Sequence, residues 1–112
     1  MISTYEEFKE KIKKGVNVVV FTADWVPVSK RVYEEVARYL ENFKVNVIEI
    51  DVGIAPRVMN EERVFIIPTI KVYVDGEVVL VQEDTTGNVS VDAEHLRRAL
   101  KEVLKKRGVP LR

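Results

Sequence analysis

The feature that most constrains the fold is a run of six residues, Val16 to Phe21, that is apolar and mostly β-branched except for Asn17. β-Branched and aromatic residues favour strands, and a strand without polar alternation is typical of a sheet covered on both faces. A second, mostly apolar stretch, residues 45–52, follows after a helical pattern. Two buried strands joined by a helix form a βαβ unit, so the sequence predicts that these two strands are parallel.

The first helix is predicted over residues 4–14, where apolar residues recur on one helical face. Ser3 and Glu6 precede this pattern with the spacing of a capping box. Gly15 follows it and is a natural stop after a helix. The sequence therefore predicts a short N-terminal helix that leads directly into the first strand.

Two longer helices and one short helix are predicted further along the chain. Pro27 suits the first turn of a helix, and apolar residues at helical spacing extend the pattern over residues 27–43. Residues 53–63 are interpreted as a loop with a short helix. The last helix is predicted to begin at Asp92, as its cap, and to stop at Gly108.

The second half of the sheet is predicted to be a β-hairpin. Asp75-Gly76, a strong hairpin signal, separates an apolar strand, residues 70–74, from a returning strand, residues 77–83. Residues 84–91 are interpreted as a polar loop. We therefore predict a single α/β domain over residues 1–112, with two parallel strands, then an antiparallel hairpin, in a four-stranded mixed sheet with helices on both faces.

The composition argues against several kinds of site and partner. The formal net charge is zero, whereas nucleic-acid-binding domains carry a basic excess. The chain has no cysteine, and His95 is the single histidine, so we expect no metal, no cofactor and no thiol catalysis. Residues 1–14 lack the apolar core of a signal peptide, and no apolar run has the length of a membrane span, so we expect a cytoplasmic protein. Glutamate and lysine dominate the charged residues, a bias typical of hyperthermophiles.

The turn after the first strand carries a resemblance to a known family. Residues 18–30 resemble the first core strand and active-site turn of the thioredoxin family, in which a tryptophan, a cysteine, two further residues, a second cysteine and a lysine follow one another. Trp25 and Lys30 stand at the family spacing, but Val26 and Ser29 stand where the cysteines would be. The resemblance implies a thioredoxin-like fold.

Three further segments, in the right order, strengthen the resemblance. Ile67-Pro68-Thr69 is similar to the cis-proline signature of the family, and it predicts a cis bond before Pro68. Asp75-Gly76 matches the family hairpin, and Gly87 falls near the glycine of a substrate-facing loop. Val20 replaces an aspartate that is often buried in the first strand, and it is predicted to be fully buried here, with no charged neighbour that could transfer a proton.

These departures predict a redox-inactive relative rather than an enzyme. A thiolate is the nucleophile of disulfide exchange, and neither a valine nor a serine supplies one. The resemblance implies that the vestigial active site forms a shallow apolar groove for an extended protein segment, or for a second copy of the chain in a homodimer. The predicted binding residues are Trp25, Val26, Pro27, Val28, Ser29, Ile67, Pro68 and Gly87.

Two alternatives stay open at this point. The natural protein would be a thioredoxin-like or glutaredoxin-like thiol–disulfide oxidoreductase if cysteines at positions 26 and 29 had been replaced in this sequence. The change at Val20 favours a naturally inert relative, because silencing an enzyme requires changes at the cysteines alone. A third interpretation is a structural subunit of a larger assembly, whose function resides in its partner.

Overall fold

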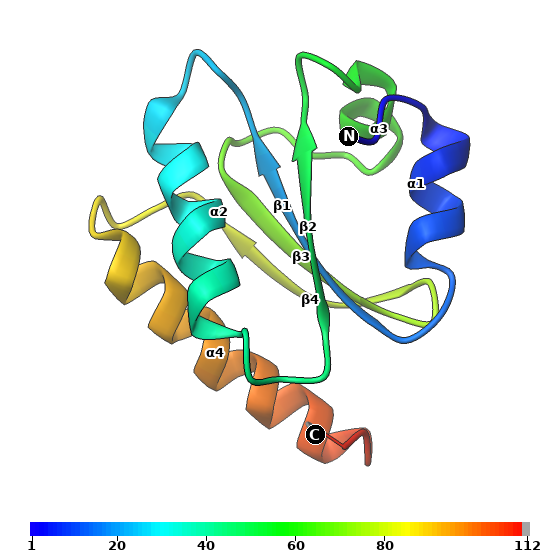
Figure 1. Cartoon of the computed structure of the whole chain (residues 1–112), viewed down its shortest axis with the longest axis vertical. Coiled ribbons are helices and arrows are strands. Elements are labelled where there is room, and N and C mark those ends of the chain that lie inside the picture. The colour runs from blue at the N-terminus through cyan, green and yellow to red at the C-terminus, as the bar shows by residue number, and fades with distance from the viewer. Residues whose placement is uncertain (111–112) are drawn as a thin grey trace.

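The computed structural model describes residues 1–110, and residues 111 and 112 of the predicted domain lie outside this part. Within it, helices and strands follow the predicted order (Figure 1). Their bounds are α1 (Tyr5–Ile12), β1 (Val16–Thr22), α2 (Pro27–Tyr39), β2 (Asn46–Asp51), α3 (Pro56–Glu61), β3 (Thr69–Val74), β4 (Glu77–Glu83) and α4 (Val89–Lys106). None of the helices within residues 1–110 combines the length and the apolar character that a membrane crossing requires.

The four strands form one mixed sheet in the order β2-β1-β3-β4. β1 pairs with β2 in parallel, whereas β1 with β3 and β3 with β4 are antiparallel. The predicted fold class, with its parallel pair and its hairpin, is confirmed. β4 lies at an edge of the sheet, where Val78 and Val81 are exposed.

Every residue of β1 is buried, because helices cover both faces of the sheet (Figure 1). Val18 and Val20 join a core cluster with residues of α2 and α4. Val19 and Phe21 point the other way and join a second cluster with residues of α1 and α3. This alternation follows from the two-residue period of a strand and explains the unbroken apolar sequence. The predicted burial of Val20 is confirmed, since its side chain is 0 % exposed.

The start of α1 differs by one residue from the prediction. Thr4, not Ser3, is the cap, and its side chain forms a capping box with Glu7 rather than Glu6. Both pairs have the same spacing in the sequence. The sequence signal alone therefore did not distinguish the two candidates, and Phe8 and Ile12 lie on the buried face of α1.

The two long helices also differ from the prediction at one end each. α2 stops at Tyr39 instead of Phe43, although Phe43 still packs against the cluster beneath α2 and so maintains the apolar pattern past the helix end. α4 begins at Val89, because the Asn88 side chain accepts hydrogen bonds from the N–H groups of Ser90 and Val91. Asp92, the predicted cap, lies inside the first turn of α4 and is buried.

Candidate functional site

The turn between β1 and α2 projects a tryptophan from the end of the sheet. Ala23 and Val26 form an isolated β-bridge, in which the Val26 N–H donates to the Ala23 carbonyl at 3.0 Å. Trp25 lies between them and is 69 % exposed. Val26 is half-buried against the core cluster that contains Val52 and Ala55. The tight bridge thus presents Trp25 outward and turns Val26 inward.

Ser29 closes this turn from below and is fully buried. Its hydroxyl donates to the Val26 carbonyl, with an O···O distance of 2.6 Å, and accepts from the Ala23 N–H at 3.0 Å. The hydroxyl thus forms its hydrogen bonds with backbone groups inside the protein, so Ser29 is a structural residue of the turn. The two positions that resemble the family's cysteines therefore hold a half-buried apolar side chain and a buried, bonded hydroxyl.

A second segment, just before β3, lies at the same end of the sheet. The Ile67–Pro68 peptide bond is cis. Pro68 is buried, while the two residues before Ile67 are exposed, Phe65 by 78 % and Ile66 by 38 %. Within residues 1–110, neither the N–H nor the carbonyl of Ile67 has a hydrogen-bond partner. This segment therefore offers free backbone groups beside exposed apolar side chains.

The loop after β4 completes this end of the sheet. Thr69, the first residue of β3, pairs in register with Phe21 of β1 on one side and with Glu83 of β4 on the other. The next residue, Asp84, donates its N–H to the Pro68 carbonyl at 2.8 Å. Asp84, with a positive φ of 67°, is thus the residue beside Pro68.

Asp84 takes the place in which the sequence predicted Gly87. Gly87 lies three residues further along this loop, is exposed, and donates its N–H to the Thr85 hydroxyl. The sequence carried no signal for Asp84, because glycine is the residue expected where the backbone is left-handed. Aspartate tolerates this conformation better than most residues.

Asp92 fixes the shape of this loop from the first turn of α4. Its buried carboxylate accepts hydrogen bonds from the Thr86 N–H at 2.9 Å and from the Thr86 hydroxyl at 2.8 Å, and also from the Thr85 hydroxyl. The loop after β4 is therefore tied to α4 by side-chain hydrogen bonds. The Asp92 side chain therefore stabilises the loop and does not cap α4.

A cluster of ionised groups lies behind the turn. The Lys30 ammonium contacts Asp51 at 2.7 Å, Glu49 at 2.8 Å and Asp24 at 3.6 Å. The Glu49 carboxylate also accepts from the Thr22 hydroxyl at 2.7 Å. Lys30 therefore joins α2 to β2, and Glu49 in turn joins β2 to Thr22 of β1.

The cluster favours the charged forms of Lys30 and Asp51. The hydrogen bond from Lys30 lowers the pKa of the Asp51 carboxyl, and this effect outweighs the burial of that carboxyl. Burial lowers the pKa of Lys30, but the hydrogen bonds to Asp51 and Glu49 outweigh it, so that this pKa lies above its ordinary value. Lys30 is thus a fixed cation and not a proton donor near neutral pH.

Glu49 was missed by sequence reasoning, and the prediction that Val20 has no charged neighbour is wrong. In the parallel pair, Glu49 is the register partner of Val20. Neighbouring pairs in this ladder, such as Val19 with Ile48, share one face of the sheet, so Glu49 lies on the same face as Val20. A carboxylate therefore does lie on this face, on β2 instead of β1. Its position could not be inferred before the register was known.

Trp25 packs back onto the loop that follows β2. A Cβ atom added at Gly53 would lie 3.2 Å from the Trp25 ring and 3.2 Å from the Asp51 carboxylate. The Asp51 carboxylate in turn accepts from the Gly53 N–H at 2.9 Å. The indole therefore rests on the bare α-carbon of Gly53, which positions the ring without burying it.

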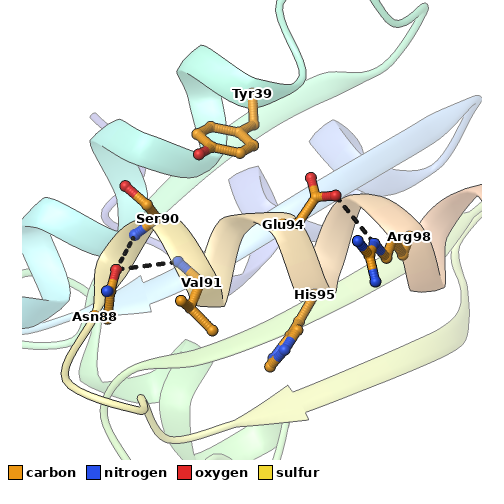
Figure 2. A pocket seen from close by; sticks show the side chains of 7 residues that line it. All are labelled: Tyr39, Asn88, Ser90, Val91, Glu94, His95 and Arg98. Atoms are coloured by element: carbon orange, nitrogen blue, oxygen red, sulfur yellow. Dashed lines mark hydrogen bonds and ion pairs between the residues drawn. The ribbon is translucent and has the colours of Figure 1, made fainter.

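A separate hollow of about 370 Å³ lies along α4, and Trp25 is not among its lining residues (Figure 2). Its lining residues are Tyr39, Asn88, Ser90, Val91, Glu94, His95 and Arg98. Most of its polar groups are occupied: Asn88 caps α4, Ser90 donates to Glu35, and Glu94 pairs with Arg97 and Arg98. Figure 2 shows that the His95 ring points away from Tyr39. This hollow brings together no set of free groups that suggests chemistry.

Comparison with known proteins agrees with this geometry. The sequence model of the thioredoxin family, described as "Thioredoxin", matches residues 1–102. The chain belongs to the thioredoxin family. It is 37 % identical over 79 residues to a thioredoxin from Staphylococcus saprophyticus, an alignment that covers 68 % of this chain and 75 % of that protein.

Solved structures share the fold of this thioredoxin-family chain. A Plasmodium falciparum thioredoxin is 26 % identical, with a TM-score of 0.73 over 90 % of this chain and 95 % of that one. A designed protein is 24 % identical and has a TM-score of 0.78, with 92 % and 94 % of the two chains covered. The likeness to the designed protein concerns the fold alone. Against this family background, the absence of cysteine from the whole sequence is the main chemical difference.

Proposed function

We propose that this chain is a redox-inactive member of the thioredoxin family that binds an extended peptide segment at the end of the sheet. We call the binding region the Trp25 surface and define it by the exposed side chains of Trp25, Pro27, Phe65 and Ile66 together with the backbone of Ile67. The observation that carries the proposal is the free N–H and carbonyl of Ile67 beside these apolar side chains.

The chemistry of the turn supports the redox-inactive part of the proposal. Disulfide exchange needs a thiolate that attacks and a second thiol that resolves the mixed disulfide. Val26 has no nucleophilic atom, and the Ser29 hydroxyl is buried and bonded to backbone groups. A hydroxyl also has no disulfide couple. Neither residue therefore replaces the lost chemistry.

The binding part rests on complementary groups. An extended peptide satisfies free backbone groups by forming main-chain hydrogen bonds, and adjacent apolar side chains add affinity by burying surface. Large exposed side chains such as Trp25 and Phe65 are costly to leave in water and are enriched at binding sites. The turn and the Ile67 segment supply both kinds of contact at one end of the sheet.

Peptide binding can be followed with the protein's own fluorescence, since Trp25 is the single tryptophan. We expect peptides selected from a random decapeptide library to shift the Trp25 emission and to perturb the Ile67 amide resonance. Trp25→Ala lacks the fluorophore, so its binding is measured from the Ile67 amide resonance. This variant should bind about 30-fold or more weakly, which corresponds to the roughly 2 kcal/mol of a binding hot spot. Val91→Ala, at an exposed valine on α4, is the matched control and should have no effect. Resonance changes confined to α4 would refute the proposal.

A further inference from the structure

We propose that the Trp25 surface selects a segment that carries a lysine or arginine close to an apolar residue. This inference rests on the proposed peptide-binding function and further specifies that the bound segment is positively charged. It starts from two neighbouring carboxylates at the end of β4, Glu83 and Asp84, which are both exposed. Within residues 1–110, neither carboxylate has a Lys or Arg partner within 4 Å.

Asp84 is held in place beside the Trp25 surface. Its N–H donates to the Pro68 carbonyl at 2.8 Å, which fixes its α-carbon next to the residue that follows Ile67. Its carboxylate accepts one hydrogen bond, from the Thr85 N–H at 2.8 Å. The remaining lone pairs of this carboxylate face no cation of the described chain, so they are available to a cation of the partner.

The turn on the other side of β3 also has an excess of negative charge. Lys30 is shared by Asp51, Glu49 and the 85 % exposed carboxylate of Asp24, so three carboxylates surround one ammonium. Arg31, next to Lys30, and Arg63, two residues before Phe65, are exposed cations. Together with Lys30 they are fewer than the carboxylates named here, which are Asp24, Glu49, Asp51, Glu83 and Asp84. An incoming acidic segment would meet net repulsion here, and a basic segment would meet attraction.

The spacing of strands sets the length of the preferred segment. β1 and β4 lie on either side of β3, so the turn and Asp84 are about two strand spacings, or roughly 10 Å, apart. An extended chain advances roughly 3.3 Å per residue. A residue against Trp25 and a residue against Asp84 are therefore about two to four positions apart in the bound segment.

The test begins with a random decapeptide display library panned against the intact protein. From the selected peptides we keep those that shift the Trp25 emission and that compete with one another for binding. We expect this set to be enriched in peptides with Lys or Arg within about four positions of an apolar residue. The best peptide is then synthesised with Lys, Gln or Glu at the basic position. The Lys form should bind roughly two- to five-fold more tightly than the Gln form, as an exposed ion pair allows, and this ratio should shrink in about 0.5 M salt.

Variants of the protein separate this inference from the proposed function. Asp84→Asn keeps both the tolerance for positive φ and the acceptor for the Thr85 N–H, and it should remove most of the preference for Lys over Gln. Glu41→Gln, the same charge change at the opposite end of α2, should leave the preference intact. Equal binding of the Lys, Gln and Glu peptides, or an unchanged preference in Asp84→Asn, would overturn the charge selectivity while leaving peptide binding established. A library that yields no peptide acting on Trp25 would overturn the proposed function and this inference together.

Discussion

Replacing Ser29 by alanine tests the hydrogen bonds that close the β1–α2 turn. The substitution removes the hydroxyl that accepts from the buried Ala23 N–H. The Ala23 and Val26 carbonyls keep other partners, since they accept from the N–H groups of Val26 and Ser29. One buried donor is thus left without a partner, and such a group costs about 1–3 kcal/mol. We expect Ser29→Ala to lower the free energy of unfolding by about 2 kcal/mol.

This loss is readily measured by thermal unfolding. An entropy of unfolding of roughly 2.1 cal/mol/K per residue gives roughly 0.23 kcal/mol/K for this chain, so about 2 kcal/mol lowers the Tm by about 8–9 °C. Urea titration followed by far-UV circular dichroism should give the same loss with an unchanged slope. Ser3→Ala removes an exposed hydroxyl and should change the stability by less than about 0.5 kcal/mol. A loss in Ser29→Ala no larger than that in Ser3→Ala would show that the hydroxyl does not hold the turn.

Three further predictions concern the same end of the sheet. Lys30→Met leaves the Asp51 carboxylate, 4 % exposed, without its cation and should cost about 1–2 kcal/mol at neutral pH, between the values for exposed and buried pairs. The folded-state pKa of Asp51 is depressed, so the stabilisation from its pair with Lys30 is complete above the ordinary pKa of 3.8 and is lost as the pH falls through the lower folded-state pKa. The stabilities of the unmodified chain and of Lys30→Met should therefore converge in acid. A constant difference between them down to low pH would contradict the assignment of the loss to the Lys30–Asp51 pair. Gly53→Ala should displace the Trp25 ring and change its emission, because the added Cβ would lie 3.2 Å from the ring, and an unaltered spectrum would contradict the contact. The same Cβ would lie 3.2 Å from the buried Asp51 carboxylate, so the substitution should also lower the stability. Val26→Cys combined with Ser29→Cys should form a disulfide under oxidant and give slow reduction of a protein disulfide with a dithiol as electron source, whereas the unmodified chain should not exceed the reductant blank.

The sheet was predictable from the sequence because its signals are local. An unbroken apolar strand indicates two covered faces, as β1 shows, and Asp75-Gly76 indicates a tight hairpin. Helix ends were less predictable. Ser3 and Thr4 offer equivalent capping signals three residues before a glutamate, so the sequence could not tell which of them caps α1. Phe43 continues the apolar pattern of α2 beyond the end of the helix, because its side chain packs against the core although its backbone is no longer helical.

The site was predictable where residues are adjacent in the chain and not where register decides. The turn around Trp25 could be recognised from its own sequence. Asp84 could not, because its place beside Pro68 depends on the register of β3 with β4, and an aspartate gives no strong signal for positive φ. Glu49 depends likewise on the register of β1 with β2. Interactions between distant segments are therefore what the sequence alone left out.

The exposed edge of the sheet has a consequence for behaviour at high protein concentration. An edge strand with free backbone groups and exposed valines is a template for aggregation. Two copies of β4 laid antiparallel about Leu80 would place Glu77 of one copy opposite Glu83 of the other, at both ends of the pair. Like charges directly opposite one another destabilise strand pairing. The acidic ends of β4 thus discourage intermolecular sheet growth, and we expect concentrated samples to remain free of β-linked aggregates.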